Sequence, residues 1–339
     1  MDVLIFSGPN DPQALRVRDE LQLRGASVML VNTSAFPETT RLSFRDRVLV
    51  YQGQPLPVPH SVYLRSLSCH PLTPTFQSEL PKRPRGLIAQ CDEKRAMLES
   101  LLLTLERRGA RTVNRLEANA QHSQKPYQLE LLRAAGLPVP RWLATNDPDA
   151  VRAFASDVGA LVYKPLAGGA TVRAVNAADL SPRRLRLLSS APVLFQERVE
   201  GMSVRAYVVG QRVVAAAEIH SRELDYRRGE DTVVPTRLSA KLQEAVLTAA
   251  QACQMEFAGV DLIRFRAGFK LLECNPSPMF ATFEKKTTTN IAGPLADYLL
   301  RSRRVGVPAN DQPETGNWKL ETGNWKPETT DQGPETKTP

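Results

Sequence analysis

Apolar and polar positions at the start of the chain follow the pattern of a βαβ unit. An apolar strand at VLIF is followed by a Gly-Pro turn, an amphipathic helix that ends at Gly25, and a second apolar strand. A further helix is predicted over about residues 92–108, after short strand-like runs at RLSF, RVLVYQGQPL and SVYLRSL. This order predicts a small α/β domain over residues 1–120.

Beyond residue 120 the pattern predicts a larger domain rich in antiparallel strands. One helix begins at Lys125, and another begins at Pro148, where Asn146-Asp147 supplies the cap. Strands joined by short turns follow, with a last helix at about residues 238–253, in the segments ALVYKPLAGGATVRAVN, VLFQERV, SVRAYVVGQRVVAAAEI and GVDLIRFRAGFKLLECN. We predict an α+β domain over residues 121–303, with lobes at residues 121–195 and 196–303.

The end of the chain has a different pattern. Over residues 304–339, Glu-Thr pairs recur with a period of seven, and ETGNWK occurs twice. A heptad is typical of coiled coils, but Gly and Pro interrupt this one and it has no apolar seam. We therefore predict a disordered low-complexity tail.

Composition is that of a globular protein, with 42% hydrophobic and 24% charged residues. No apolar run approaches the ~20 residues that span a bilayer, so we expect a cytoplasmic protein without a membrane partner. The four cysteines lie far apart without CxxC spacing, which indicates free buried thiols and no zinc or disulfide framework.

The basic charge of the chain favours anionic partners. The formal net charge is +8, and residues 311–339 carry six acids against three lysines, so removing that net −3 leaves +11. Such an excess attracts ATP or an acidic peptide, and nucleic acid equally. Because the arginines are dispersed and form no stripes with aromatic residues, we favour a solvated basic surface over a nucleic-acid interface.

Two apolar strands near residue 270 carry a candidate metal site. Glu273 and Asn275 are two positions apart on one strand and face the same way, whereas Cys274 points back into the core. Asp261, on the preceding strand, completes a set of oxygen ligands that suits Mg²⁺. A salt bridge or turn at the strand ends would explain the same residues.

Two further segments suggest a nucleotide site. Lys164 closes the apolar strand ALVYK and precedes Gly168-Gly169, where backbone N–H groups can approach a phosphate closely. An exposed lysine on a hairpin turn is the simpler alternative, since neither GK[ST] nor GxGxxG is present. In VLFQERVEG an apolar strand turns polar, and the backbone of residues 197–199 could read an adenine edge. A strand that simply leads into a turn would explain the same sequence equally well.

In this order the motifs resemble the ATP-grasp superfamily, and within it the RimK-type glutamate ligases and the microviridin-type (graspetide) peptide ligases. Asp261 with ECNPSP is similar to the metal motif, and FEKKTTTNIAGPLADYL resembles the RimK-type ending. Segments similar to graspetide ligases are SVYLR, GLPVPRWLATNDP and EIHSRELDYRR. The resemblance implies an ATP-grasp architecture, with a pre-grasp domain at 1–120, the ATP-grasp domain at 121–303 and the disordered repeat tail at 304–339.

Matching positions imply roles in binding ATP and Mg²⁺. The metal ligands would be Asp261, Glu273 and Asn275, for two ions, with Mn²⁺ as an alternative. The residues placed against ATP would be Lys125, Lys164, Gly168 and Gly169 at the phosphates, and Gln196, Glu197, Arg198 and Val199 around the adenine.

Two arginines and one departure from the family pattern complete the implied site. Arg205 and Arg227 match arginines near the transferring phosphate and are predicted to be catalytic. Ser203 stands where relatives usually have an acid that grips the ribose, which implies a weaker contact there.

The resemblance implies an ATP-dependent carboxylate–amine or carboxylate–hydroxyl ligase that forms an acyl phosphate on an amino acid, peptide or protein substrate. One alternative is a graspetide-type macrocyclase that makes ester or amide links in a precursor peptide. Another is a non-catalytic nucleotide- or peptide-binding module, favoured by Ser203 and opposed by the complete metal-ligand set. A nucleic-acid binder is a third, and a homo-oligomer is left open.

Overall fold

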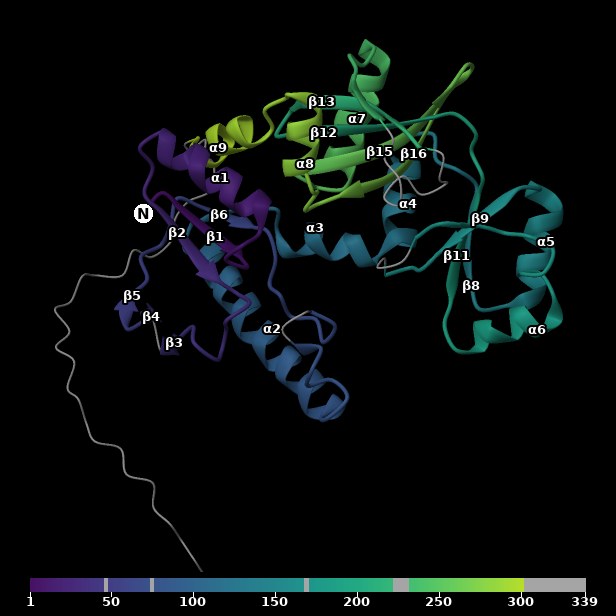
Figure 1. The fold of residues 1–339 in the computed structure, drawn as a ribbon. Coiled ribbons are helices and arrows are strands. Elements are labelled where there is room, and N and C mark those ends of the chain that lie inside the picture. Colours follow the sequence, from purple (N-terminus) through teal and green to yellow (C-terminus); the bar gives the residue numbers. More distant parts are fainter. Residues whose placement is uncertain (46–47, 74–75, 168–170, 222–231, 302–339) are drawn as a thin grey trace, which may run out of the picture. The chain divides into compact units, whose positions relative to one another are not determined.

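The computed structural model describes residues 1–45, 48–73, 76–167, 171–221 and 232–301, and it begins with the predicted βαβ unit. The unit consists of β1 (Val3–Ser7), α1 (Pro12–Leu23) and β2 (Val28–Asn32), as Figure 1 shows. Asp11 starts the helix, since its Oδ1 accepts from the N–H groups of the second and third helical residues. Gly25 follows the helix at a φ of 74°, as the glycine stop predicted.

A parallel sheet forms the centre of the N-terminal region, in the order β2-β1-β6-β7. Its other strands are β6 (Ser61–Leu64) and β7 (Arg111–Val113), and every residue of β1 is buried because side chains cover both faces of the sheet. A small antiparallel sheet precedes β6 and consists of β3 (Leu42–Arg45), β4 (Val48–Tyr51) and β5 (Gln54–Pro55).

The long helix α2 (Pro84–Arg107) corrects one predicted boundary. The apolar spacing suggested a start near Asp92, but the helix begins at Pro84. Proline is favoured in the first turn because its fixed φ suits a helix and the missing N–H is not needed there. Leu98, Leu101, Leu102 and Leu105 pack this helix against the parallel sheet.

A second, antiparallel sheet has the order β10-β9-β11-β8. α3 (Leu116–Ala120), a short 3₁₀ turn (Gln121–Ser123) and α4 (Lys125–Ala134) lead toward it. Its strands are β8 (Trp142–Thr145), β9 (Leu161–Lys164), β10 (Arg173–Ala174) and β11 (Val193–Glu197). One face packs on α5 (Pro148–Val158), α6 (Pro182–Leu185) and the 3₁₀ turn Arg186–Ser189, as Figure 1 shows.

The third sheet is antiparallel, in the order β14-β13-β12-β15-β16. Its strands are β12 (Met202–Val209), β13 (Arg212–His220), β14 (Thr232–Pro235), β15 (Phe257–Phe265) and β16 (Gly268–Asn275). α7 (Ala240–Ala252) covers one face. α8 (Ala281–Thr287) and α9 (Ala292–Leu300) lie on the other, where they share a core with β1, α1 and β6.

The described elements up to Arg301 belong to one compact unit, residues 1–304. Side chains from the N-terminal sheet and from residues beyond 200 share one apolar core, so the division at residue 120 remains a prediction. The predicted repeat tail lies outside the described residues. Within the part of the chain that is described, no helix is long and apolar enough to cross a membrane.

Candidate active site

Two neighbouring strands bring two carboxylates and an amide together. β15 and β16 run antiparallel with Asp261 opposite Glu273, and Asn275 follows two positions later on the same strand. The Asn275 amide group donates to Asp261 Oδ2 at 3.2 Å and to Glu273 Oε1 at 3.3 Å. Cys274 lies in the core beneath α7. The structure therefore has the juxtaposition that strand alternation predicted.

Two predicted cations contact these carboxylates directly. Lys125, at the start of α4, donates from Nζ to Glu273 Oε2 at 2.5 Å. Arg205, on β12, donates from Nε to Asp261 Oδ1 at 2.8 Å and from a terminal nitrogen to Oδ2 at 2.6 Å. Asp261 and Lys125 are buried, and buried charges in proteins are normally paired in this way. The result is a compact, charge-balanced network on four elements, α4, β12, β15 and β16.

The electrostatics of this network keep Glu273 ionised. Burial by itself would raise the pKa of Glu273, but the attraction of Lys125 and Lys164, the hydrogen bond from Lys125 and the charge of Arg205 lower that pKa well below its usual range. A lowered pKa means that Glu273 stays a carboxylate at neutral pH. It is therefore in the state that a cation ligand requires.

Lys164 and Gln196 share one face of the second sheet. In the antiparallel pair β9 and β11, Lys164 lies opposite Leu194 and Val162 lies opposite Gln196, so their side chains point the same way. Tyr163 and Phe195 point to the other face, where α5 and α6 pack. Lys164 and Gln196 are both buried, and no described residue bonds the buried Gln196 Nε2. The Gln196 N–H₂ group is therefore a buried hydrogen-bond donor without an acceptor among the described residues.

The segment predicted to frame adenine uses two of its backbone N–H groups in hydrogen bonds within the fold. The N–H of Glu197 donates to the Arg141 carbonyl at 2.8 Å, and the N–H of Arg198 donates to the Ala160 carbonyl at 2.9 Å. These two N–H groups are therefore not open to an adenine edge, which corrects that part of the prediction. An adenine contact through Val199 and the carbonyl groups of this segment stays a prediction.

The side chain of Glu197 joins two sheets. Its carboxylate accepts from Lys270 Nζ at 2.6 and 2.7 Å and from the Arg141 N–H at 3.0 Å. Burial opposes ionisation of Glu197, but these hydrogen bonds lower its pKa. Because Glu197 is on β11 and Lys270 is on β16, the ion pair connects the sheet of Lys164 to the sheet of Asp261. Lys270 was not among the residues predicted from the sequence.

The structure describes no contact between the network and four further predicted residues, Ser203, Gly168, Gly169 and Arg227. Ser203 lies on β12 two positions before Arg205 and on the same face, opposite Ile219 and Ile263. Its proposed ribose contact stays a prediction. The other three, Gly168, Gly169 and Arg227, lie outside the described residues.

The donor set fits a hard divalent cation. Carboxylate and amide oxygens are what Mg²⁺ prefers, and it commonly takes few protein ligands together with substrate phosphates. Among the described residues, no group of three or more His, Cys, Asp and Glu side chains is placed to hold a metal ion, so a cation here would rely on Asp261, Glu273, the Asn275 amide and the substrate. The cations Lys125, Lys164 and Arg205 beside them, with the orphaned Gln196 amide, fit an adenine nucleotide.

Helix α4 holds the metal-motif strand in place through a residue that the sequence reading missed. Gln128 Nε2 donates to the Cys274 carbonyl at 2.8 Å, and its Oε1 accepts from the Cys274 N–H at 2.8 Å. Both bonds are buried. Since Gln128 sits one turn after Lys125, one helix positions both the lysine and the strand between Glu273 and Asn275.

We expect the Gln128→Ala variant to lose about 2–4 kcal/mol of unfolding free energy, because two buried backbone groups of Cys274 would lose their partners. Chemical denaturation at neutral pH measures this loss. Glu130→Ala, an exposed position on the same helix, is the matched control and should stay within about 0.5 kcal/mol of the parent. Equal stability of the two variants would contradict the proposed stabilisation of the Cys274 backbone by Gln128.

Two N-terminal residues hold the turn that follows the metal motif. Asn114 Nδ2 donates to the carbonyls of Phe257 and Pro276, both at 2.6 Å. Arg65 donates from one terminal nitrogen to the Ser277 carbonyl at 2.6 Å and to its Oγ at 2.5 Å, while its Nε donates to Asp11. The first sheet and the metal motif are therefore joined by polar contacts as well as by the shared core.

Known proteins are similar to this chain in sequence and in fold. Residues 123–299 match the RimK-like ATP-grasp domain family. A Legionella pneumophila (strain Corby) protein named "Probable alpha-L-glutamate ligase" is 30% identical over 213 residues, which cover 59% of this chain and 70% of that protein.

Solved structures extend the similarity to the N-terminal region. The ATP-grasp ligase PsnB, complexed with a phosphomimetic variant of its minimal precursor, Mg and ADP, aligns with a TM-score of 0.81 at 35% identity, over 88% of this chain and 97% of PsnB. The macrocyclase MdnC from Microcystis aeruginosa MRC, bound with precursor peptide MdnA, aligns with a TM-score of 0.76 over 89% of this chain and 100% of MdnC. At 20% identity, MdnC shows a shared fold.

The family match, the curated relative and the alignment with PsnB together define an ATP-grasp ligase. The matched residues make up half of the chain, and the curated relative is matched over more than two thirds of its length. The chain belongs to the RimK-like ATP-grasp family. The predicted superfamily, fold class and enzyme class are confirmed.

Proposed function

We propose that this ligase activates side-chain carboxylates of a precursor peptide with ATP and joins them to hydroxyl or amine groups of the same peptide. The observation that carries the proposal is the extent of the similarity to PsnB, which covers 88% of this chain. The family match alone covers residues 123–299 and does not distinguish a peptide substrate from an amino acid. PsnB was solved with a minimal precursor, and the shared N-terminal region supports a substrate of the same kind.

The proposed reaction has two steps. A carboxylate oxygen of the peptide attacks the γ-phosphorus of ATP, the bond to ADP breaks, and an acyl phosphate forms. A hydroxyl or amine then attacks the acyl carbon, loses its proton and displaces phosphate. Since charge develops on phosphoryl oxygens in the first step, positioning and neutralisation carry most of the catalysis.

The residues of the network have distinct proposed roles. Lys125 and Lys164 neutralise the phosphates, and Arg205 stabilises the transferring group while it holds Asp261. Asp261, Glu273 and Asn275 hold Mg²⁺, proposed as two ions with Mn²⁺ as a substitute. The bound cation would shield the charge of the polyphosphate. Arg227, Ser203 and the Gly168-Gly169 loop keep their predicted places beside the phosphate, the ribose and the polyphosphate.

A second candidate is the addition of glutamate or another amino acid to a peptide or protein. The family match and the relative named as a glutamate ligase favour it. Incubation of the full chain with Mg-ATP, free glutamate and synthetic peptides rich in Thr, Lys, Glu and Asp separates the two functions by intact mass. Macrocyclisation removes one water per link, whereas ligation adds an amino-acid residue. Phosphate release without either mass change would contradict the macrocyclase proposal.

A further inference from the structure

The turn that follows the metal motif is stiff because of its sequence. It reads Asn275-Pro276-Ser277-Pro278, so proline fixes φ at two positions and restricts the residue before each of them to extended conformations. A segment with so few free dihedral angles moves as a unit. A group that fixes Ser277 therefore also limits the position of Asn275, two residues earlier.

Arg65, directly after β6, fixes Ser277 through both its side chain and its backbone. One terminal nitrogen of Arg65 donates to the Ser277 carbonyl at 2.6 Å and to the Ser277 Oγ at 2.5 Å. That hydroxyl donates in turn to the Arg65 carbonyl at 2.9 Å. Tyr207 holds the same turn further on, because its hydroxyl donates to the Met279 carbonyl at 2.7 Å. The turn is therefore held by residues that lie far from it in the sequence.

Arg65 is itself held by Asp11, the residue that caps α1. Its Nε donates to Asp11 Oδ1 at 3.2 Å and to Oδ2 at 3.1 Å, and Oδ1 also accepts from the helix N–H groups. The Arg65 side chain is only 12% exposed, so water competes weakly for these bonds. Two nitrogens of one guanidinium connect Asp11 to Ser277. A lysine has a single ammonium nitrogen and cannot take both positions at once.

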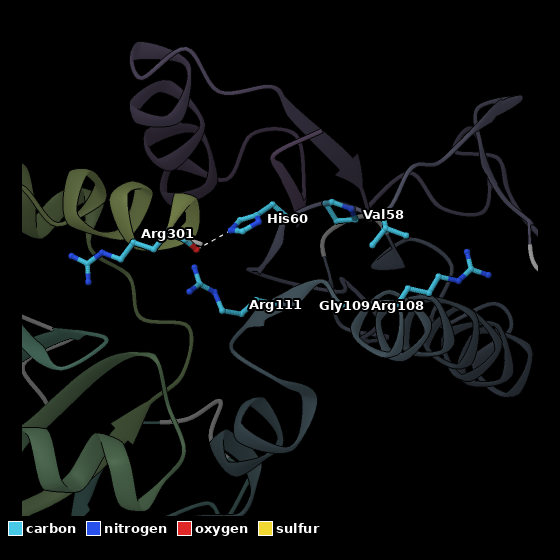
Figure 2. Close-up of a pocket in the computed structure, with 7 residues that line it drawn as sticks. Val58, His60, Arg108, Gly109, Arg111 and Arg301 are labelled. Atoms are coloured by element: carbon cyan, nitrogen blue, oxygen red, sulfur yellow. Dashed lines mark hydrogen bonds between the residues drawn. The ribbon is translucent and has the colours of Figure 1, made fainter. Parts of the chain in front are cut away.

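The other end of β6 is fixed as well, at the end of α9. Figure 2 shows the His60 ring directed toward the Arg301 carbonyl, and its Nε2 lies 2.8 Å from that oxygen. The next residue, Ser61, donates from Oγ to the Leu299 carbonyl at 2.8 Å. The strand is therefore joined to later parts of the chain at both ends, and Arg65 supplies the contact at the metal motif.

We propose that Arg65 is a positioning residue of the metal site, which holds Asn275 in place through Ser277 and makes Mg²⁺ binding depend on the N-terminal sheet. The inference rests on the proposed function, in which Asp261, Glu273 and Asn275 are the metal ligands. Groups that orient metal ligands without touching the metal commonly change metal affinity by about 10–100-fold. Arg65 is such a group, because its described bonds go to Asp11 and Ser277.

The test is the binding of Mn²⁺, a paramagnetic substitute for Mg²⁺, to the full chain in the presence of ADP. Electron paramagnetic resonance measures the free Mn²⁺. We expect Arg65→Lys to weaken Mn²⁺ binding by about tenfold, since the lysine keeps the charge but cannot hold Asp11 and Ser277 together. The affinity for ADP without metal should stay close to that of the parent, because Arg65 contacts no predicted nucleotide residue.

Two control variants separate positioning from a general loosening of the fold. Ser61→Ala removes the bond to α9 at the other end of β6. Arg24→Lys changes another arginine that joins α1 to α9, through Asp297. Both variants should keep the Mn²⁺ affinity of the parent even if they unfold more readily. If they weaken Mn²⁺ binding as much as Arg65→Lys does, the positioning role of Arg65 is wrong.

Parental Mn²⁺ affinity in a folded Arg65→Lys protein would also overturn the proposal. If Arg65→Lys does not fold, Ser277→Ala replaces it, since this variant loses both Oγ bonds and keeps the carbonyl. It should weaken Mn²⁺ binding by roughly threefold, and unchanged binding would contradict the proposal. The proposed function fails separately, through a chain that binds Mn²⁺ normally and modifies no peptide, because Mn²⁺ binding does not depend on turnover.

Discussion

The Glu273→Ala variant is expected to lose ATP turnover by at least about 100-fold, since it removes a proposed metal ligand and the carboxylate that holds Lys125. The lowered pKa of Glu273 means that the parent presents a carboxylate throughout the neutral range. The variant leaves Lys125 and Lys164 without this counter-charge. Phosphate release at saturating Mg-ATP and peptide measures the loss.

Controls distinguish loss of function from loss of fold in this experiment. Glu244→Ala, an exposed position on α7, removes the same side chain outside the site and should leave turnover unchanged. Glu273→Gln keeps the size but not the charge, and should be nearly as inactive as the alanine variant. Both Glu273 variants must retain cooperative unfolding. If the folded Glu273→Ala protein retained the turnover of the parent, the result would contradict the proposed role of this site in ligation and favour a non-catalytic module.

Local patterns were sufficient to predict that Asp261, Glu273 and Asn275 lie together. Alternation along β16 places Glu273 and Asn275 on one face, independently of the rest of the fold, and the preceding strand β15 supplies Asp261. Helix starts at Lys125 and Pro148 were also predicted, because caps and prolines act within a few residues. These features depend on short-range geometry, which the sequence carries directly.

Contacts between distant segments could not be predicted in the same way. Gln128 bonds the backbone of Cys274, and Lys270 bonds Glu197, yet neither pair has a spacing that marks it in the sequence. The occupied N–H groups of Glu197 and Arg198 depend on which strands lie beside β11. Strand order is set by tertiary packing, so a single sequence without relatives leaves it undetermined. The start of α2 at Pro84 was missed, although Leu87 and Cys91 continue the helical spacing of its buried face toward the N-terminus.

Replacement of Arg205 should have the second large effect on catalysis. Its two donated bonds hold both oxygens of Asp261, and its charge faces the proposed phosphate site. We expect Arg205→Ala to lower kcat by about 10²–10³-fold, the range for removal of one donor to a developing oxyanion. Arg205→Lys should recover only part of this loss, since an ammonium group cannot bond both carboxylate oxygens in a planar fork.

The neighbouring pair of Arg264 and Glu218 provides the matched control for Arg205. It lies on the same sheet, Arg264 is on β15, and its side chain is 39% exposed. Exposed pairs contribute roughly 0–1 kcal/mol, so Arg264→Lys should leave kcat close to that of the parent. Single-turnover phosphate release compares the variants at the chemical step. If Arg205→Lys matches the parent, positive charge alone suffices at this position, and the bidentate grip on Asp261 has no part in catalysis.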